Sequence, residues 1–375
     1  MTKLTTQQPA FARGLSIVSK AVGRSTSLPV LANILIGAFA GEGARLTATD
    51  LTASITVDLE AACDSDFGIT LPAKTLVDLV ATLPDGELTL TLNDRTHAAT
   101  INSGRTKASV KGIAADEFPT IHRLNADKAV SLSGPVLRGM LRGVLFAAAK
   151  PDSGRPVLET VLLTIEGDRL ALAASDGFRV AEIARTLPSK YESVSVLLPA
   201  KSARDLAGLI DGADEVLMQE HDGRAIFRAG NVEIAMQTVE GTFPKYHGIV
   251  PKSYATRAVV DTESARKACK SVDIIAREQA HRMSVVIAPG DELTPGSVSL
   301  FGEAAQTGDN RAEMDATIEG GEVKFAVNAQ YMADPLAAYD AEQVAVEVTK
   351  PTAPIMLRPV GDDGAWCVVM PLALA

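Results

Sequence analysis

The chain has 375 residues, of which 46% are hydrophobic and 22% are charged, and its formal net charge is -10 at pH 7. A chain of this length and composition can bury enough apolar surface for two or three domains, which excludes a disordered protein. The acidic balance argues against a protein that coats nucleic acid with its whole surface, although it allows one local basic face.

Hydrophobic periodicity predicts the elements of the first third of the chain. The spacing of one apolar helix face fits Phe11, Leu15, Val18 and Val22. Residues 54–59 and 88–92 alternate between apolar and polar side chains, which is typical of half-buried strands. The sequence LPAK at 71–74 is typical of a strand end followed by a helix, whose apolar face would hold Leu76, Leu79, Val80 and Leu83.

The same elements recur further along the chain. A second amphipathic helix is predicted from Leu137, Leu141 and Val144, and a strand from residues 194–198. A third helix is predicted from the apolar positions Ala265, Cys269, Val272 and Ala276. Each third of the chain therefore combines two helices with a larger set of mostly antiparallel strands, which is an α+β arrangement.

Repeated motifs indicate three copies of one unit. LPAK at 71–74 recurs at 198–201, PVL at 29–31 recurs at 156–158, and the Phe-Pro pair at 118–119 recurs at 243–244. In the third unit VNAQ at 327–330 stands where LPAK is expected. Turn-rich segments follow each Phe-Pro pair, so we place the domains at residues 1–126, 127–251 and 252–375.

Basic residues concentrate on the first helix of each unit. These helices carry Arg13, Lys20, Arg24, Arg138, Arg142, Lys150, Arg266, Lys270 and Arg277. The segments 5–24, 133–150 and 261–282 sum to +7, which leaves -17 for the rest of the chain. A single charged helix face is usually only solvated, but three equivalent basic helices in an acidic protein favour a surface that faces a polyanion.

Motifs for catalysis or metal binding do not occur in the sequence. It has no phosphate-binding P-loop, no HExxH spacing among its five histidines and no GxSxG nucleophile. Asp50 and Asp176 recur at equivalent positions after strands, where we interpret them as turn residues rather than acid–base catalysts. Cys63, Cys269 and Cys367 are too far apart for a metal-ligand pair, and we expect all three to be buried.

Targeting signals are also missing from the sequence. The N-terminus lacks the apolar stretch of a signal peptide, and the longest apolar run, residues 28–41, is too short to span a bilayer. We therefore expect a cytoplasmic protein. Because the catalytic and metal-binding motifs are missing as well, we expect that it is not an enzyme and needs no cofactor or metal.

In order along the whole chain, the motifs resemble the bacterial DNA polymerase III beta subunit, or sliding clamp, family. The resemblance rests on SLPVLANILI, LTATDLTASI, LPAK, SGRTKASVKG, DEFP, RPVLETVLL, ASDGFRVAE, the second LPAK, VEGTFPKYHGIVP and the terminal VVMPL. It implies three clamp domains per chain and a head-to-tail homodimer that closes as a ring around double-stranded DNA. The implied function is processivity of DNA polymerase III alpha and repair polymerases, loaded by a clamp loader.

The resemblance also implies three sets of site residues. DNA contact would fall on Arg24 and on the loop that holds Lys150 and Arg155. A pocket for partner peptides would use Leu158, Ser175, Gly177, Phe178, Arg179, Val180, Pro244, Ile249, Asn328, Tyr331, Pro354, Val368, Met370, Pro371 and Leu372. The dimer interface would use Lys74, Arg105, Lys107, Ala108, Ile274, Ile275, Asp309 and Glu313.

Several residues depart from the family pattern. The sequence ends in LALA without a basic residue, His247-Gly248 replaces a frequent basic pair, and Ala108 stands at a position that is often aromatic. Pro335 falls inside the expected short helix of the third unit, where it removes a backbone donor. A second hypothesis is therefore a clamp paralogue that keeps the peptide pocket but forms no ring, acting as an adaptor or resistance copy. A third is an enzyme with a site between units.

Overall fold

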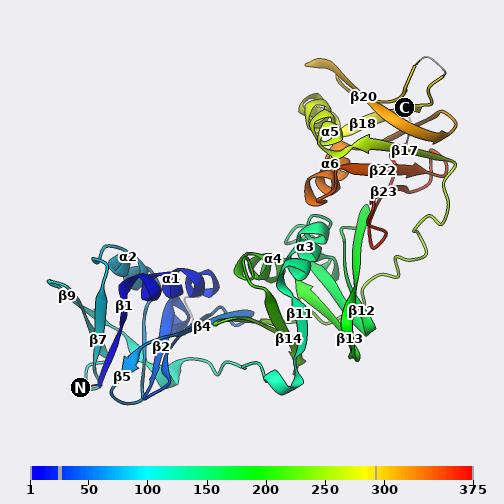
Figure 1. Ribbon diagram of the computed structural model, residues 1–375. Coiled ribbons are helices and arrows are strands. Elements are labelled where there is room, and N and C mark those ends of the chain that lie inside the picture. The colour runs from blue at the N-terminus through cyan, green and yellow to red at the C-terminus, as the bar shows by residue number, and fades with distance from the viewer. Residues whose placement is uncertain (1, 24–27, 292–293, 374–375) are drawn as a thin grey trace. The chain divides into compact units, whose positions relative to one another are not determined.

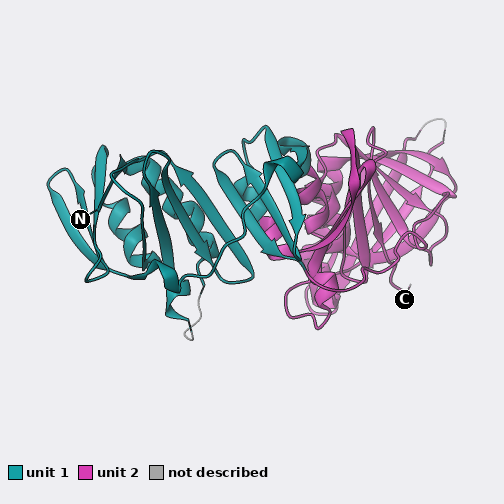
Figure 2. Cartoon of the chain, turned by 90° about the horizontal axis from the view of Figure 1, so that it is seen from below, with its two compact units in different colours: residues 1–138, 205–238 teal, residues 139–204, 239–375 magenta. Residues whose placement is uncertain are grey.

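The computed structural model describes residues 2–23, 28–291 and 294–373. The chain forms two compact units (Figure 2), one made of residues 1–138 and 205–238 and the other of residues 139–204 and 239–375. Helices α3 (Gly134–Leu145) and α4 (Ala200–Leu209) each begin in one unit and end in the other. Short 3-10 turns lie at Ser19–Ala21, Pro29–Ala32, Ala115–Glu117, Ala126–Lys128, Pro156–Glu159 and Arg277–Gln279.

Unit 1 contains two antiparallel sheets and the helices α1 (Gln8–Val18) and α2 (Ala73–Ala81) (Figure 1). Its strands are β1 (Thr2–Gln7), β2 (Asn33–Phe39), β3 (Gly43–Thr49), β4 (Ala53–Leu59), β5 (Ala62–Cys63), β6 (Phe67–Pro72), β7 (Glu87–Asn93), β8 (Ala98–Ser103), β9 (Thr106–Lys111), β10 (Ile113–Ala114), β11 (Val130–Ser133), β14 (Glu215–His221), β15 (Arg224–Ala229) and β16 (Val232–Gln237). The sheet orders are β5-β1-β7-β8-β9 and β10-β6-β2-β3-β4-β16-β15-β14-β11.

Unit 2 contains one ten-stranded sheet and the helices α5 (Thr262–Ala276) and α6 (Ala329–Ala338), which lie together in Figure 1. Its strands are β12 (Thr160–Ser175), β13 (Arg179–Pro199), β17 (Thr256–Asp261), β18 (Arg282–Ala288), β19 (Gly296–Ala304), β20 (Gly308–Gly320), β21 (Val323–Asn328), β22 (Gln343–Val348), β23 (Ile355–Pro359) and β24 (Ala365–Val369). Their order is β12-β13-β24-β23-β22-β17-β20-β19-β18-β21.

The α+β class expected from the sequence is confirmed, and the strands of the expected second domain join two different sheets. Strands β11, β14, β15 and β16 continue the sheet of the first domain, whereas β12 and β13 pair with strands of the third. In unit 1, Val232 of β16 pairs with Val57 of β4, and in unit 2, Val180 of β13 pairs with Val368 of β24. The domain boundaries near 126 and 251 remain predictions.

The predicted apolar helix faces are buried because each one packs against a sheet. Phe11, Leu15 and Val18 are fully buried on α1, but Val22 lies beyond the helix and is half-buried. The stripes on α3 and α5 are buried throughout. On α2, Leu76 and Val80 are fully buried, whereas Leu79 is half-buried. Burying each large aliphatic side chain contributes about 1.5–3 kcal/mol.

LPAK marks a strand-to-helix junction, as expected. Strand β6 ends at Pro72 and α2 begins at Ala73, and the same junction joins β13 to α4. In the third copy Asn328 ends β21 and caps α6, because its Oδ1 accepts hydrogen bonds from the amides of Gln330 at 2.9 Å and Tyr331 at 3.2 Å. Pro335 lies inside α6, as expected, and is buried.

The two repeated aspartates are turn residues, as expected. Asp50 Oδ1 accepts hydrogen bonds from the backbone amides of Thr52 at 3.0 Å and Ala53 at 2.8 Å. Asp176 Oδ1 accepts the equivalent bonds from Phe178 at 2.9 Å and Arg179 at 3.0 Å. Each carboxylate therefore closes a tight turn between two strands.

The cysteines differ in burial, so the expectation that all three are buried is wrong for Cys63. Cys63 lies in β5, at the edge of its sheet, and is half-buried, whereas Cys269 and Cys367 are buried. Burial raises the pKa of all three thiols, to about 12 for Cys269 and Cys367, so access is what distinguishes Cys63. A thiol reagent needs both access to the sulfur and formation of the thiolate. At neutral pH we therefore expect it to modify only Cys63 in the native chain and all three cysteines in the unfolded chain. Peptide mass mapping after timed alkylation identifies the site, and modification of Cys367 in the native chain would contradict this expectation.

A cluster of charges in unit 1 surrounds Asp58. Its carboxylate contacts Arg45 Nε at 2.8 Å and the Nη2 atoms of Arg123 and Arg228 at 3.1 and 3.5 Å. Burial by itself raises the pKa of Asp58, but the hydrogen bond from Arg45 and the charge of Arg123 outweigh burial and hold the pKa below its usual range.

The lowered pKa predicts a loss of stability in acid. An acid whose folded-state pKa is depressed stabilises the fold above its unfolded-state pKa and loses that contribution as the pH falls through the folded-state pKa. We expect Asp58→Asn to lower the free energy of unfolding by about 1 kcal/mol at pH 7, because the pairs are partly exposed. Urea titrations from pH 7 to pH 3 should show the two proteins converging in acid. A difference that is constant over this range would contradict the prediction.

Candidate functional site

Several large apolar side chains of unit 2 are exposed. Phe178, Ile249, Met370 and Leu372 are 57%, 47%, 38% and 37% exposed. Phe178 stacks on the half-buried Tyr331 with ring centroids 6.5 Å apart, and the amide of Met370 donates to the carbonyl of Phe178 at 2.9 Å. We call Phe178, Tyr331, Met370 and Leu372 the Phe178 patch. All four residues were among those expected to bind partner peptides.

The turn that carries Phe178 is fixed by its own sequence. Ser175 Oγ donates to the carbonyl of Arg179 at 2.8 Å and accepts from the amide of Gly177 at 3.1 Å. Gly177 has a φ of 92°, and a Cβ there would lie 2.8 Å from Arg155 Nη1, so a larger residue would be strained and crowded. Together with the Asp176 turn, these bonds hold the ring of Phe178 outward.

Arg179 ties this turn to α6. Its side chain is only 9% exposed; Nε lies 3.1 Å from Asp176 Oδ2 and Nη1 lies 2.6 Å from Asp334 Oδ2. Its Nη2 donates to the carbonyl of Phe146, and its guanidinium lies 4.4 Å from the ring centroid of Tyr331. It also lies 5.3 Å from the ring centroid of Phe146, so the guanidinium uses all three nitrogens and contacts two aromatic rings. The sequence did not indicate Asp334 or Phe146, because neither follows a recognisable motif.

Beneath the patch lies an apolar core. Val180 and Val368 are at most 1% exposed and pack with Phe243, Tyr246 and Trp366. Leu158 is 7% exposed, and its side chain lies next to Gly177. These three aliphatic residues were expected in the peptide pocket, and the structure places them below the surface. They support the patch from underneath.

A buried carboxylate fixes the segment that carries Pro244 and Ile249, both of which are exposed. Glu182 on β13 is 4% exposed and accepts hydrogen bonds from the Tyr246 hydroxyl at 2.5 Å and from Arg169 Nη2 at 2.7 Å. Burial and then this hydrogen bond raise the pKa of Tyr246 well above its usual value. The sequence pattern gave no sign of this contact, because the two residues lie 64 positions apart.

The remaining expected pocket residues lie in unit 2 as well. Asn328 caps α6 next to Tyr331, and the amide of Leu372 donates to the carbonyl of Ala326 at 2.7 Å. Pro354 and Pro371 are half-buried. Strand pairing thus brings segments from the expected second and third domains together around Phe178.

The basic residues expected to face DNA differ in whether their side chains already have a partner within the protein. Arg13, Lys20, Arg142, Lys150, Lys270 and Arg277 are exposed. Arg138 is half-buried and lies 2.9 Å from Asp211, and Arg155 is exposed with its Nη2 donating to the carbonyl of Asp176 at 3.0 Å. Arg24 lies outside the described residues.

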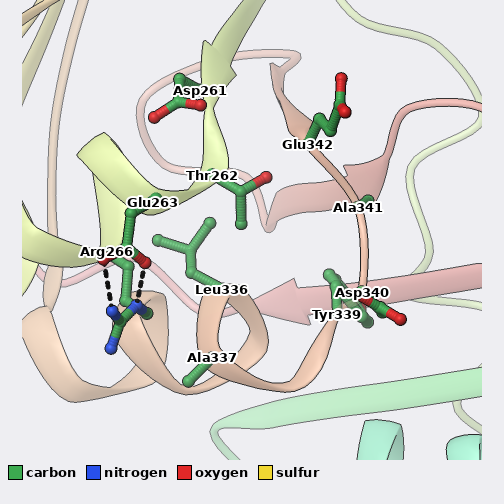
Figure 3. Close-up of a pocket in the computed structure, with 10 residues that line it drawn as sticks. All are labelled: Asp261, Thr262, Glu263, Arg266, Leu336, Ala337, Tyr339, Asp340, Ala341 and Glu342. Atoms are coloured by element: carbon green, nitrogen blue, oxygen red, sulfur yellow. Dashed lines mark hydrogen bonds and ion pairs between the residues drawn. The ribbon is translucent and has the colours of Figure 1, made fainter.

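Arg266 lies beside an acidic pocket at the start of α5. The pocket, of about 560 Å³, is lined by Asp261, Glu263, Asp340 and Glu342, and Figure 3 shows Arg266 paired with Glu263 at its side. The two nitrogen–oxygen distances of this pair are 2.6 and 2.7 Å. Arg266 is therefore partly neutralised within its own helix and offers less charge to a polyanion than Lys270 does.

The residues expected at the dimer interface lie on or beside strands β9 and β20 and on helices α2 and α5. Lys107 and Ala108 belong to β9, at the edge of the five-stranded sheet of unit 1, and Arg105 precedes it; Lys74 is exposed on α2. In unit 2, Asp309 and Glu313 are exposed on β20. Ile274 on α5 is 57% exposed, and Ile275 is half-buried.

Three family models match the chain in order. They are the N-terminal domain of the DNA polymerase III beta subunit over residues 2–122, the central domain over 131–245 and the C-terminal domain over 247–373. The chain belongs to the DNA polymerase III beta subunit family. A beta sliding clamp of Synechococcus elongatus is 32% identical, and one of Staphylococcus aureus is 28% identical, each over 99% of both chains.

Solved structures of the beta subunit family share the fold. The DNA polymerase III beta subunit of Thermotoga maritima has a TM-score of 0.88 at 26% identity, and the sliding clamp of Bacillus subtilis has a TM-score of 0.92 at 23% identity. Each comparison covers the whole of both chains. In the described part of the chain, no three His, Cys, Asp or Glu residues gather as metal ligands would. No helix within residues 2–23, 28–291 and 294–373 is long and apolar enough to cross a membrane.

Proposed function

We propose that this protein is a DNA sliding clamp. Two copies close head to tail into a ring around double-stranded DNA and hold DNA polymerase III alpha, the clamp loader and repair polymerases through short peptides. The observation that carries the proposal is the match of three clamp-domain models in order over nearly the whole chain. This function needs no catalytic group, cofactor or metal, and its setting is the cytoplasm.

Exposed cations support the DNA-facing surface. Arg13, Lys20, Arg142, Lys150, Lys270 and Arg277 all expose their charge on or just after first helices. No carboxylate lies within salt-bridge distance of these six in the described part of the chain. Exposed cations of this kind give screened phosphate contacts without base readout, which is what a ring that slides along DNA requires. Arg138, Arg155, Arg266 and Arg24 complete the proposed set.

Two strand edges support the dimer interface. Among the strands that the structure describes, β9 pairs with β8 and forms the end of its sheet. In β20 the stretch 308–316 pairs with β19, whereas only residues 317–320 pair with β17. Edge strands carry free backbone donors and acceptors, so β9 of one copy can add to β20 of another. Lys74, Arg105 and Lys107 would then face Asp309 and Glu313, which gives a heterologous contact that a ring needs.

Exposed apolar area supports peptide binding at the Phe178 patch. Aromatic and aliphatic side chains on a rigid base, with the half-buried Asn328 at the margin, suit a short peptide anchored by a few apolar side chains. Ile249 and Pro244 would extend this surface along the segment that Glu182 holds.

Loading onto DNA tests the ring. The cognate clamp loader with ATP should place the protein on nicked circular DNA, where gel filtration should retain it. Cutting that DNA once should release most of the protein, because only topology holds it. Equal retention on circular and linear DNA would overturn the ring. A protein that binds the polymerase peptide but sediments only as a monomer at micromolar concentration would instead be the non-ring adaptor or resistance paralogue.

A further inference from the structure

Unit 1 contains a second pocket, of about 230 Å³, that no expected site includes. The segment 119–123 covers strands β2, β3 and β4 there, and the apolar lining comes from Leu35, Phe39 and Ile121. The buried hydroxyls of Thr47 and Thr56 lie 3.2 Å apart and satisfy each other. A dry cavity of about 150 Å³ is enough for benzene, so this pocket has room for a bicyclic ring.

The repeat explains why the space exists. Tyr246 follows the repeated Pro244 by two positions, and in unit 1 the residue two positions after Pro119 is Ile121. In unit 2, Glu182 lies six positions after the repeated Asp176 and pairs across the strands with Trp366. In unit 1, Thr56 lies six positions after Asp50 and pairs across the strands with Glu233, so Glu233 stands where unit 2 has Trp366.

Aromatic rings fill the equivalent space in unit 2. The rings of Tyr246 and Trp366 lie 6.0 Å apart between centroids, and both belong to the buried core under the Phe178 patch. Unit 1 has isoleucine and glutamate in their places, and neither side chain has the volume of an aromatic ring. Ile121 lines the pocket, so the pocket lies where the other copy of the repeat has the larger ring of Tyr246.

Around this pocket the charges do not balance. Arg45, Arg123 and Arg228 gather about Asp58 and Glu233, which is three cations against two anions. Glu233 is 3% exposed and pairs with Arg123 Nε at 2.7 Å; burial raises its pKa, and the charge of Arg123 acts in the opposite direction.

Arg45 lines the pocket and can donate further hydrogen bonds there. It uses Nε for Asp58 and lies over the ring of Phe39 at 5.0 Å. Its two terminal nitrogens have no hydrogen-bond partner within residues 2–23, 28–291 and 294–373. A guanidinium offers five N–H donors, so these nitrogens can hold both oxygens of a carboxylate.

We propose that this pocket binds a planar apolar ring that carries one carboxylate. The ring lies among Leu35, Phe39 and Ile121, and the carboxylate pairs with the terminal nitrogens of Arg45. Such a group is either a small aromatic acid or the C-terminal aromatic residue of a peptide. The site lies wholly in unit 1 and does not depend on the proposed clamp function or on the Phe178 patch.

Indole-3-carboxylate and neutral indole are the probes, titrated by ligand-observed NMR and calorimetry. We expect saturable binding of indole-3-carboxylate to the full chain. Ile121→Tyr, which places a ring where unit 2 has Tyr246, should abolish binding of both probes. Arg45→Gln should weaken indole-3-carboxylate by about tenfold or more while changing indole less than about twofold, because only the charged contact is lost. Arg95→Gln, an exposed arginine of unit 1 outside the pocket, is the matched control.

The outcomes separate the possibilities. No saturable binding by the unmodified chain overturns the proposal, and so does binding that survives Ile121→Tyr in a variant whose thermal unfolding is unchanged. A peptide that ends in tryptophan identifies the source: if its free-acid form displaces indole-3-carboxylate and its C-terminal amide does not, the natural occupant is a chain end. If neither peptide displaces the probe, the occupant is a small aromatic acid.

Discussion

Phe178→Ala is expected to weaken binding of a peptide copied from the cognate DNA polymerase III alpha subunit by about 30-fold or more, which corresponds to about 2 kcal/mol. The ring is 57% exposed, yet it is held by the Asp176 turn and stacked on Tyr331. A rigid, exposed aromatic side chain loses little conformational entropy when a ligand covers it, so most of the apolar contact appears as affinity.

The same exposure means that this substitution should leave stability almost unchanged, which separates loss of contact from loss of fold. Tyr254→Ala is the matched control, since Tyr254 is an aromatic residue of unit 2 that is 43% exposed and lies outside the patch. Fluorescence anisotropy with a labelled peptide measures both variants. If the two variants bind equally well, the Phe178 patch is not the peptide site.

Arg179→Gln should have the largest effect on the stability of unit 2, a loss of about 3 kcal/mol in the free energy of unfolding. The substitution leaves Asp176 without its cation in a site where the side chain is only 14% exposed, and it removes the contact to Asp334. It also leaves the carbonyl of Phe146 without this donor and the ring of Tyr331 without its cation. Arg179→Lys should recover only a minor part, because an ammonium cannot reach all these partners at once.

Trp366 makes the measurement specific to unit 2. It is the only tryptophan of the chain, and it is 8% exposed in the core beneath the patch. Urea unfolding followed by its fluorescence therefore reports on the unit that holds Arg179. Arg185→Gln, which breaks the half-exposed pair with Asp362, is the control and should cost about 1 kcal/mol or less. Similar losses for Arg179→Gln and Arg185→Gln would contradict the role of Arg179 as the tie between the turn and α6.

Both predictions depend on residues that the sequence indicated only in part. The motif ASDGFRVAE included Phe178 and Arg179, and the Asp-Gly pair within it predicts a tight turn from local chemistry. The partners of Arg179 were not predictable, because Phe146 is 33 and Asp334 is 155 positions away. Contacts at such separations follow from how strands pair, which side-chain periodicity does not encode.

The sequence by itself determined the main helices, several strands and the repeat. Apolar residues spaced at the helical period, such as Phe11, Leu15 and Val18, predict a helix with one buried face. The two LPAK motifs predicted two strand-to-helix junctions from local residue preferences. It also located the basic helices, because charge is a property of residues and not of their packing.

Only the tertiary structure decided how the repeats combine. Cross-strand pairing of β13 with β24 and of β16 with β4 placed strands from different thirds of the chain in one sheet. That pairing brought Phe178 beside Tyr331 and set Val368 below the surface. It also left a pocket at Ile121, where the second copy has Tyr246. Which side chains share a volume depends on register across strands, and register is fixed by the packing of whole sheets.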